Sequence, residues 1–165
     1  MNIEYTNKTA TSTIELEDYF PLTVNFHDAP DLVRHYQIYN ADTDMLEFET
    51  DYETGLNLRM KLLLCNHVGL LDRPVSIPSA SAGELVFSGA DLFESDSAEL
   101  LTDIFLLNIC TDGVELTLGE GEPDVYVRSG SVTFGLDGSN RVTRIIVSGM
   151  TANEISHLRE EIQAR

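Results

Sequence analysis

Carboxylates occupy every second position of one short segment of the chain, residues 46–53. The acidic positions are Glu47, Glu49, Asp51 and Glu53. The positions between them carry apolar, aromatic or threonine side chains, namely Leu46, Phe48, Thr50 and Tyr52. Neighbouring residues of a β-strand point to opposite faces of the sheet, so this segment is predicted to be a strand with one acidic face. Such a row of carboxylates can hold a metal ion, assist proton transfer or bind a cationic partner.

The acidic row repels itself and needs an explanation. Residues two apart on a strand lie about 6.7 Å apart, and unit charges at roughly that distance repel by about 0.6 kcal/mol in water. Three explanations are open. Arg59 and Lys61 offset the row from across a hairpin that turns at Gly55, or the row lies on an edge strand, where charge blocks aggregation, or it holds a cationic partner. We take the partner as the working hypothesis. The predicted partner-binding residues are Asp42, Asp44, Glu47, Glu49, Asp51, Glu53, Asp91 and Glu94.

The sequence argues against a metal site in this segment. Asp42, Asp44 and Glu53 match positions 1, 3 and 12 of a calcium-binding loop, but Leu46 supplies no side-chain ligand at position 5. Glu47 stands where that loop needs glycine. The sequence also lacks a phosphate-binding loop ending in Gly-Lys-Ser/Thr, a Gly-x-Ser-x-Gly elbow, a His-Glu-x-x-His motif and a Cys-x-x-Cys motif. We therefore predict a protein that is not an enzyme and has no catalytic residue, metal or cofactor.

The remaining residues whose side chains could take part in catalysis or binding have ordinary structural interpretations. The histidines are His27, His35, His67 and His157, and we interpret them as structural or surface residues. Cys65 and Cys110 both lie in apolar runs, which predicts reduced, buried thiols. Tyrosines beside the acids are possible anchors for a partner, although Tyr52 shares its parity with Phe48 and is predicted to pack in the core.

The charge of the chain has two open explanations, a basic partner or the general acidity of a halophilic or acidic proteome. There are 28 acids and 10 bases, a net charge of −18. Residues 1–127 carry a net charge of −19 and residues 128–165 a net charge of +1. A surface of this sign repels nucleic acid and anionic membranes and attracts cations, and the charge exceeds the value of about 2–8 that solubility alone requires. With no apolar run of about 18 residues and no signal-like N-terminus, we expect a cytoplasmic protein.

The elements that must position these residues are mostly strands. Alternating patterns predict strands at 13–20, 22–26, 36–39, 45–54, 56–62, 84–87, 113–118, 124–128, 131–136 and 141–147. Helices are predicted at 28–35, at 95–109 and at the C-terminus, where Thr151 and Glu154 form a capping box. The predicted fold is α+β: a β-rich single domain over residues 1–165 with mainly antiparallel sheet and two or three helices, including a C-terminal helix.

Three features give the chain a family resemblance: the acidic row at 47–53, a second acid-rich segment at 91–103, and the hairpin at 126–147. In these features and in its acidic, motif-free character, the chain resembles the bacterial immunity proteins of contact-dependent growth inhibition and related polymorphic toxin systems. The resemblance implies that the chain binds and neutralises a cognate basic toxin domain in a tight 1:1 complex. Such toxins are often nucleases, whose active site the acids would cover.

A second family offers an alternative. Type III secretion chaperones are similar in being small, acidic and cytosolic with α+β folds, and they bind apolar effector segments as dimers. The chain has more predicted strands and fewer predicted helices than that family, and its acids form rows where an apolar groove would be needed. The alternative function is therefore an acidic secretion chaperone that binds an effector segment as a dimer.

Overall fold

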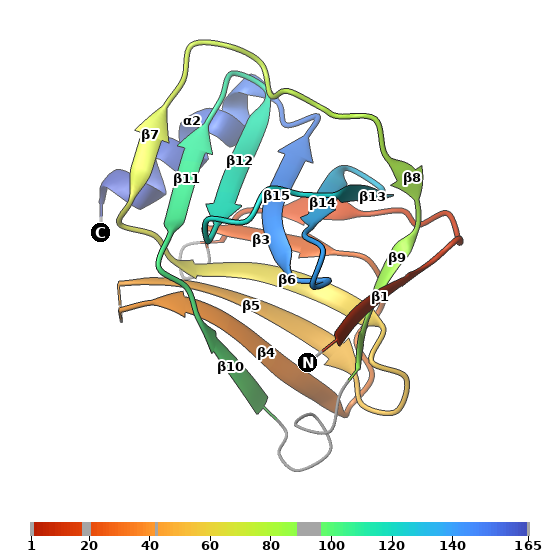
Figure 1. Cartoon of the computed structure of the whole chain (residues 1–165). Helices are drawn as coiled ribbons and strands as arrows, with labels where there is room; N and C mark the ends of the chain where they lie inside the picture. The colour runs from red at the N-terminus through yellow and green to blue at the C-terminus, as the bar shows by residue number, and fades with distance from the viewer. Residues whose placement is uncertain (1, 18–20, 42, 89–96, 165) are drawn as a thin grey trace.

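The computed structural model describes residues 2–17, 21–41, 43–88 and 97–164. Within these residues the chain forms two large sheets, a two-stranded ribbon and one helix (Figure 1). The six-stranded sheet contains β2 (Thr13–Glu15), β3 (Leu22–Asn25), β4 (Val33–Asn40), β5 (Asp44–Asp51), β6 (Asn57–Leu64) and β10 (Ser97–Leu101). Its strand order is β10-β4-β5-β6-β3-β2, in which only the β10–β4 pair is parallel.

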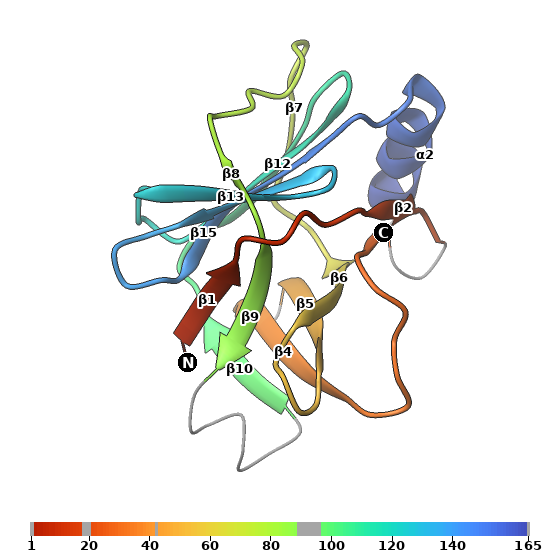
Figure 2. The same ribbon diagram turned by 90° about the vertical axis from the view of Figure 1, so that its right-hand side faces the viewer.

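The second sheet has seven strands. They are β7 (Val68–Leu70), β8 (Ser81–Ala82), β11 (Phe105–Ile109), β12 (Gly113–Leu118), β13 (Val125–Ser129), β14 (Val132–Leu136) and β15 (Val142–Ser148). The order is β7-β11-β12-β15-β14-β13-β8, with antiparallel pairing except at the two short edge strands β7 and β8. The remaining strands, β1 (Asn2–Thr6) and β9 (Glu84–Ser88), pair antiparallel as a separate ribbon. This ribbon is in the foreground of Figure 2.

Aromatic side chains from all three sheets meet in one core. The ring of Phe48 in β5 lies 5.1 Å from that of Phe87 in β9 and 6.2 Å from that of Phe134 in β14. All three phenylalanines are fully buried. Because ring pairs at these separations add to the hydrophobic gain of burial, they tie the ribbon and both sheets into one cluster.

The C-terminal helix α2 (Ala152–Gln163) is confirmed with its predicted capping box. The Thr151 hydroxyl accepts from the Glu154 backbone N–H, and the Glu154 carboxylate accepts from the Thr151 backbone N–H at 2.6 Å. The helix buries Ile155 and Leu158 against the sheets. It is too short to cross a membrane, and no described helix is long and apolar enough to do so.

The other two helix predictions are wrong. Residues 33–40 form strand β4, in which Arg34, Tyr36 and Ile38 are buried in alternation with half-buried residues. Residues 97–101 and 105–109 form β10 and β11, and β11 buries every second side chain. The helix prediction rests on Asp96 and Glu99, whose spacing matches a capping box, and it overlooks this period-two pattern. Long-range pairing of β10 with β4, and of β11 with β12 and β7, determines the conformation instead.

The coarse prediction of a β-rich α+β fold agrees with the structure, although the described residues contain one helix rather than two or three. The predicted hairpin between the acidic row and Arg59 is confirmed as β5–β6. The C-terminal hairpin is confirmed as β14–β15, with a turn in which Asn140 has a positive φ of 56°. Cys65 and Cys110 are both free and buried, as predicted.

Candidate functional site

Strand β5, which carries the acidic row, lies inside the six-stranded sheet with β4 on one side and β6 on the other. The explanation by an edge strand is therefore wrong. The prediction that the row is open to a partner is also wrong for its central members, because Glu47 is 8% and Glu49 5% exposed. Tyr52, predicted to pack in the core, is instead exposed in the turn after β5, with the Arg34 guanidinium 4.1 Å from its ring centre.

Cross-strand cations neutralise Glu49, in line with the first of the three explanations. Glu49 lies opposite Arg59, and Glu47 lies opposite Lys61 in the β5–β6 register. The Arg59 guanidinium donates to Glu49 at 3.1 Å, and the Lys61 ammonium also donates to Glu49. Arg59 is held in turn by the Asn25 side-chain oxygen at 2.5 Å. A buried carboxylate is stable when such partners satisfy it.

The histidine next to this pair completes a group with metal-ligand chemistry. Ligand atoms of His35, Glu47 and Glu49 lie within 4.8 Å of one another. The His35 Nδ1 is 3.3 Å from Glu47, which also accepts a hydrogen bond from Gln37 at 2.8 Å. Glu49, however, is already bound by two cations, and a metal ion would have to displace both against their repulsion. The group therefore fits an internal polar network better than a metal centre.

Asp44, at the start of β5, is fully buried. It accepts hydrogen bonds from the backbone N–H groups of Asn66 and His67 and lies 2.5 Å from the His67 ring nitrogen Nδ1. Burial alone would raise the pKa of Asp44, but these hydrogen bonds outweigh it and hold the pKa below its usual value. Asp44 therefore joins β5 to the segment between β6 and β7, and the prediction that it is open to a partner is wrong.

The other predicted partner-binding residues differ in their surroundings. Asp51 is half-buried and accepts from the backbone and hydroxyl of Thr54, which closes the β5–β6 turn and lowers the pKa of Asp51. Glu53, in the same turn, is exposed. Asp42, Asp91 and Glu94 lie outside the described residues. Of the eight predicted residues, Glu53 alone is described as an exposed acid.

Cys65, His67 and Asp44 have the residue types of a nucleophilic triad but not its geometry. The Cys65 thiol is buried and donates to the backbone carbonyl of His67 at 3.8 Å. Burial and the nearby Asp44 raise the pKa of Cys65 to about 12. Since the thiolate is the reactive form of cysteine, this arrangement disfavours a nucleophilic role for Cys65.

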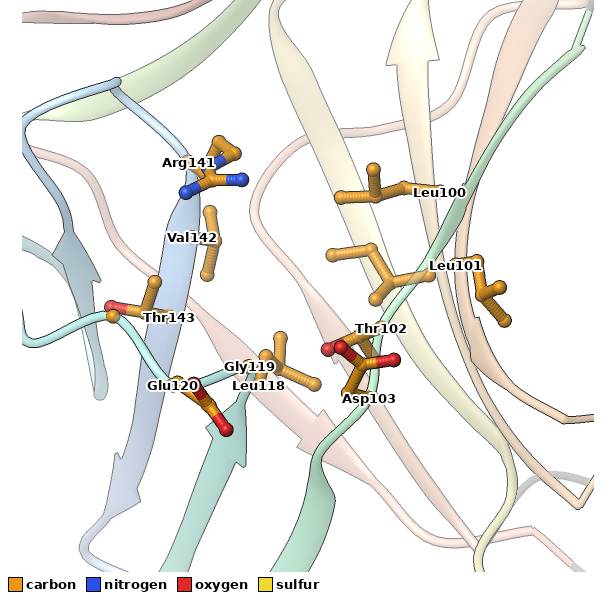
Figure 3. Close-up of a pocket in the computed structure, with 12 residues that line it drawn as sticks. Leu100, Leu101, Thr102, Asp103, Leu118, Gly119, Glu120, Arg141, Val142 and Thr143 are labelled. Atoms are coloured by element: carbon orange, nitrogen blue, oxygen red, sulfur yellow. The ribbon is translucent and has the colours of Figure 1, made fainter.

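A cleft opens where β10 leaves one sheet and the chain passes into β11 of the other (Figure 3). Its volume is about 270 Å³. The lining residues come from the ends of β10 and β12, the turns after these two strands, the residue before β15 and the start of β15, with one residue from β4. They are Leu100, Leu101, Thr102, Asp103, Leu118, Gly119, Glu120, Gly121, Arg141, Val142, Thr143 and Ile38. The cleft thus combines an apolar floor with charged groups at its rim.

Two turns hold the acids of this cleft in place. The Gly119 N–H donates to the Ile104 carbonyl at 2.9 Å, which joins the turn after β12 to the turn after β10. Gly119 has a φ of +73°, a conformation that glycine adopts without steric cost. Asp103 and Glu120 are therefore brought to the same cleft, and Figure 3 shows both carboxylates toward the same end of it.

The charges of the cleft are unequally satisfied. Arg141 donates its Nε and Nη2 to the buried carboxylate of Asp137 at 3.1 and 2.9 Å. Asp103 and Glu120 are exposed, and within the described part of the chain neither takes part in an ion pair. Leu101 at the rim is 59% exposed. The cleft consequently presents unneutralised negative charge beside apolar surface.

The sequence contains acids in both segments, at 99–103 and at 119–124, but no local pattern places the two segments together. Their meeting depends on the parallel pairing of β10 with β4, which brings residues 97–101 beside a strand some sixty positions earlier. The only local signals were the acids of 119–124 around two glycines and the acid at 103 after an apolar run. Another acid of that region, Glu115, is neutralised by a bidentate pair with Arg73, which lowers the pKa of Glu115.

No protein-family model matches this chain, and a search of curated proteins finds no match. No residue role is therefore carried over from a relative.

Proposed function

We propose that the chain is an immunity protein that binds and neutralises a cognate basic toxin domain in a 1:1 complex. The toxin class we propose is a nuclease. The chain acts in the cytoplasm by occlusion and without catalysis of its own. The supporting observation is the convergence of exposed acids from two separate segments around one partly apolar cleft, with Asp103 and Glu120 at its rim. In the β5 row, which the sequence favours for this role, Glu47 and Glu49 are buried in the sheet and Glu49 is paired with two cations.

Electrostatics supports this assignment of the binding surface. Exposed acids continue from the cleft along both segments, at Glu99 and at Asp124. A basic partner approaching this end of the molecule gains from the whole acidic field of the chain, which raises association rates by about 10–1000-fold. Nucleic acid and anionic membranes are repelled by the same field, so they are not proposed as partners.

The experiment that tests this proposal uses the gene directly upstream. Its product is expressed alone and together with this chain, and growth is measured, followed by calorimetry of the purified pair at low and high salt. We expect growth arrest that the chain relieves and a 1:1 complex that weakens as salt rises. A neighbouring product that is harmless, or that does not bind, would contradict the proposal.

The chaperone alternative makes a different prediction. Its motivating observation is a second cavity, between β7 and α2, which is partly lined by Val68, Leu70 and Ile162, with Leu70 exposed. A chaperone of this class would be a stable dimer in sedimentation experiments. A monomer at high concentration would contradict the alternative and leave the immunity proposal standing.

A further inference from the structure

The floor of the cleft is suited to an aliphatic chain. Ile38, Leu118 and Val142 are buried beneath it, and half-buried Leu100 lines its side. These residues come from both large sheets, so the floor is fixed by the core rather than by one loop. At about 270 Å³ the cleft has room for one long side chain. An apolar floor of this kind favours methylene groups over a hydrated ion.

The rim of the cleft selects for positive charge. Asp103 and Glu120 stand on two different turns and leave their carboxylates open to solvent. The cation that also lines the cleft, Arg141, is directed at Asp137, which offsets its charge. A ligand with an aliphatic stem and a cationic head therefore complements both the floor and the rim.

We propose that this cleft receives an arginine side chain from a basic segment of a partner protein. The stem lies against Leu100 and Leu118, and the guanidinium donates to Asp103 and Glu120. The proposal rests on the proposed function, since it names the group by which the basic toxin is recognised. Arginine fits better than lysine because the guanidinium presents five donors in a plane and can serve two carboxylates at once. It is also more weakly hydrated than an ammonium and enters a half-apolar cleft at lower cost.

The test is an NMR titration of the full chain with the peptide acetyl-Gly-Arg-Gly-amide. Matched peptides carry lysine, citrulline or norleucine in place of arginine. We expect saturable shifts of the backbone amides at 101–103 and 119–121 with the arginine peptide. Affinity should fall several-fold with lysine and at least tenfold with citrulline, which keeps the shape of arginine without its charge. Equal affinity for the citrulline peptide would overturn the proposal.

Variants locate the binding site. Asp103→Asn combined with Glu120→Gln should weaken the arginine peptide at least tenfold. The control pair Asp31→Asn with Glu15→Gln removes the same charge from exposed acids elsewhere and should change affinity less than twofold. A further variant, Leu101→Lys, places a competing cation at an exposed rim position and should also weaken binding. The proposal would be overturned by equal losses of affinity for the arginine peptide in the cleft and control variants. It would also be overturned by amide shifts spread evenly over all exposed acids.

Failure of this inference and failure of the proposed function are distinguishable. If the upstream toxin binds the Asp103→Asn/Glu120→Gln protein as tightly as the unaltered chain, the arginine site is overturned and the immunity function stands. If the arginine peptide binds in the cleft but the upstream product does not bind, the site stands and the immunity function is overturned.

Discussion

The two acidic regions of this protein, the β5 acids (Asp44, Glu47 and Glu49) and the cleft acids (Asp103 and Glu120), differ in what surrounds them. The β5 acids lie in a strand with neighbours on both sides, and each is buried and hydrogen-bonded. The cleft acids lie in turns at the mouth between the two large sheets and are exposed. Position in the sheet, rather than the density of acids in the sequence, thus decides which carboxylates are available to a partner.

The comparison also separates two physical roles for a carboxylate. A buried carboxylate is desolvated, so losing its partners costs stability. An exposed carboxylate contributes little to folding and keeps its charge for association. Substitutions of the β5 acids should therefore change stability, whereas substitutions of the cleft acids should change binding.

The largest effect is expected for Asp44→Ala. This change removes the acceptor for two backbone N–H groups and for the His67 ring. We expect a loss of about 3 kcal/mol in the free energy of unfolding, measured in urea. The control is Asp72→Ala, which alters an exposed acid and should stay within about 0.5 kcal/mol. Equal losses in the two variants would contradict a structural role for Asp44.

A smaller loss is expected for Lys61→Met, which leaves buried Glu49 with Arg59 as its remaining cation. We expect about 2 kcal/mol of destabilisation. The chain offers a matched control in Lys8→Met, because Lys8 is its other lysine and is exposed. That variant should unfold at the same urea concentration as the unaltered protein.

The pair Glu49 and Lys61 can be tested further by a double variant. Adding Glu49→Gln to Lys61→Met removes the charge that Lys61 offsets, so part of the lost stability should return. Strictly additive losses from the two changes would show that Lys61 does not stabilise the protein through Glu49.

Lowering the pH should reveal the contribution of Asp44 to folding stability. Folding lowers the pKa of Asp44, so its charged form stabilises the native state above the usual carboxyl pKa, and this stabilisation is lost as the pH falls through the lowered value. We expect stability, measured in urea at each pH, to fall more between pH 5 and pH 2 in the unaltered protein than in Asp44→Asn. Identical pH profiles would argue against this linkage.

The smallest effect on stability is expected for Glu120→Gln in the cleft. The residue is exposed and lies near Asp103, so removing its charge relieves a weak repulsion. We expect a change within about 0.5 kcal/mol, in the stabilising direction. A loss of 2 kcal/mol or more would mean, by the usual range for surface sites, that Glu120 serves the fold as the β5 acids do.

Local pattern was sufficient for much of this fold. The alternation in 46–50, the turn at Gly55 and the Thr151–Glu154 capping box each specify their element through contacts near in sequence. Local pattern fails at 97–109, where Asp96 and Glu99 have the spacing of a capping box but the burial of residues 105–109 has period two. The pairing of that run with distant strands outweighs its local preference.

The site was less predictable for the same physical reason. The sequence presents Glu47 and Glu49 as one face of a strand, and Arg59 and Lys61 were visible as candidates to neutralise them. Whether β5 is central or at an edge depends on β4, β6 and β10, and no local pattern encodes that order. The meeting of Asp103 with Glu120 depends on the same long-range arrangement.

The most direct test compares two double variants that remove the same charge, Glu47→Gln/Glu49→Gln in β5 and Asp103→Asn/Glu120→Gln in the cleft. The measurement is the free energy of unfolding of each protein in urea. We expect the β5 variant to lose about 4 kcal/mol and the cleft variant to stay within about 0.5 kcal/mol of the unaltered chain. Equal stabilities, or a larger loss in the cleft variant, would contradict the division between acids that hold the sheet and acids that are open to a partner.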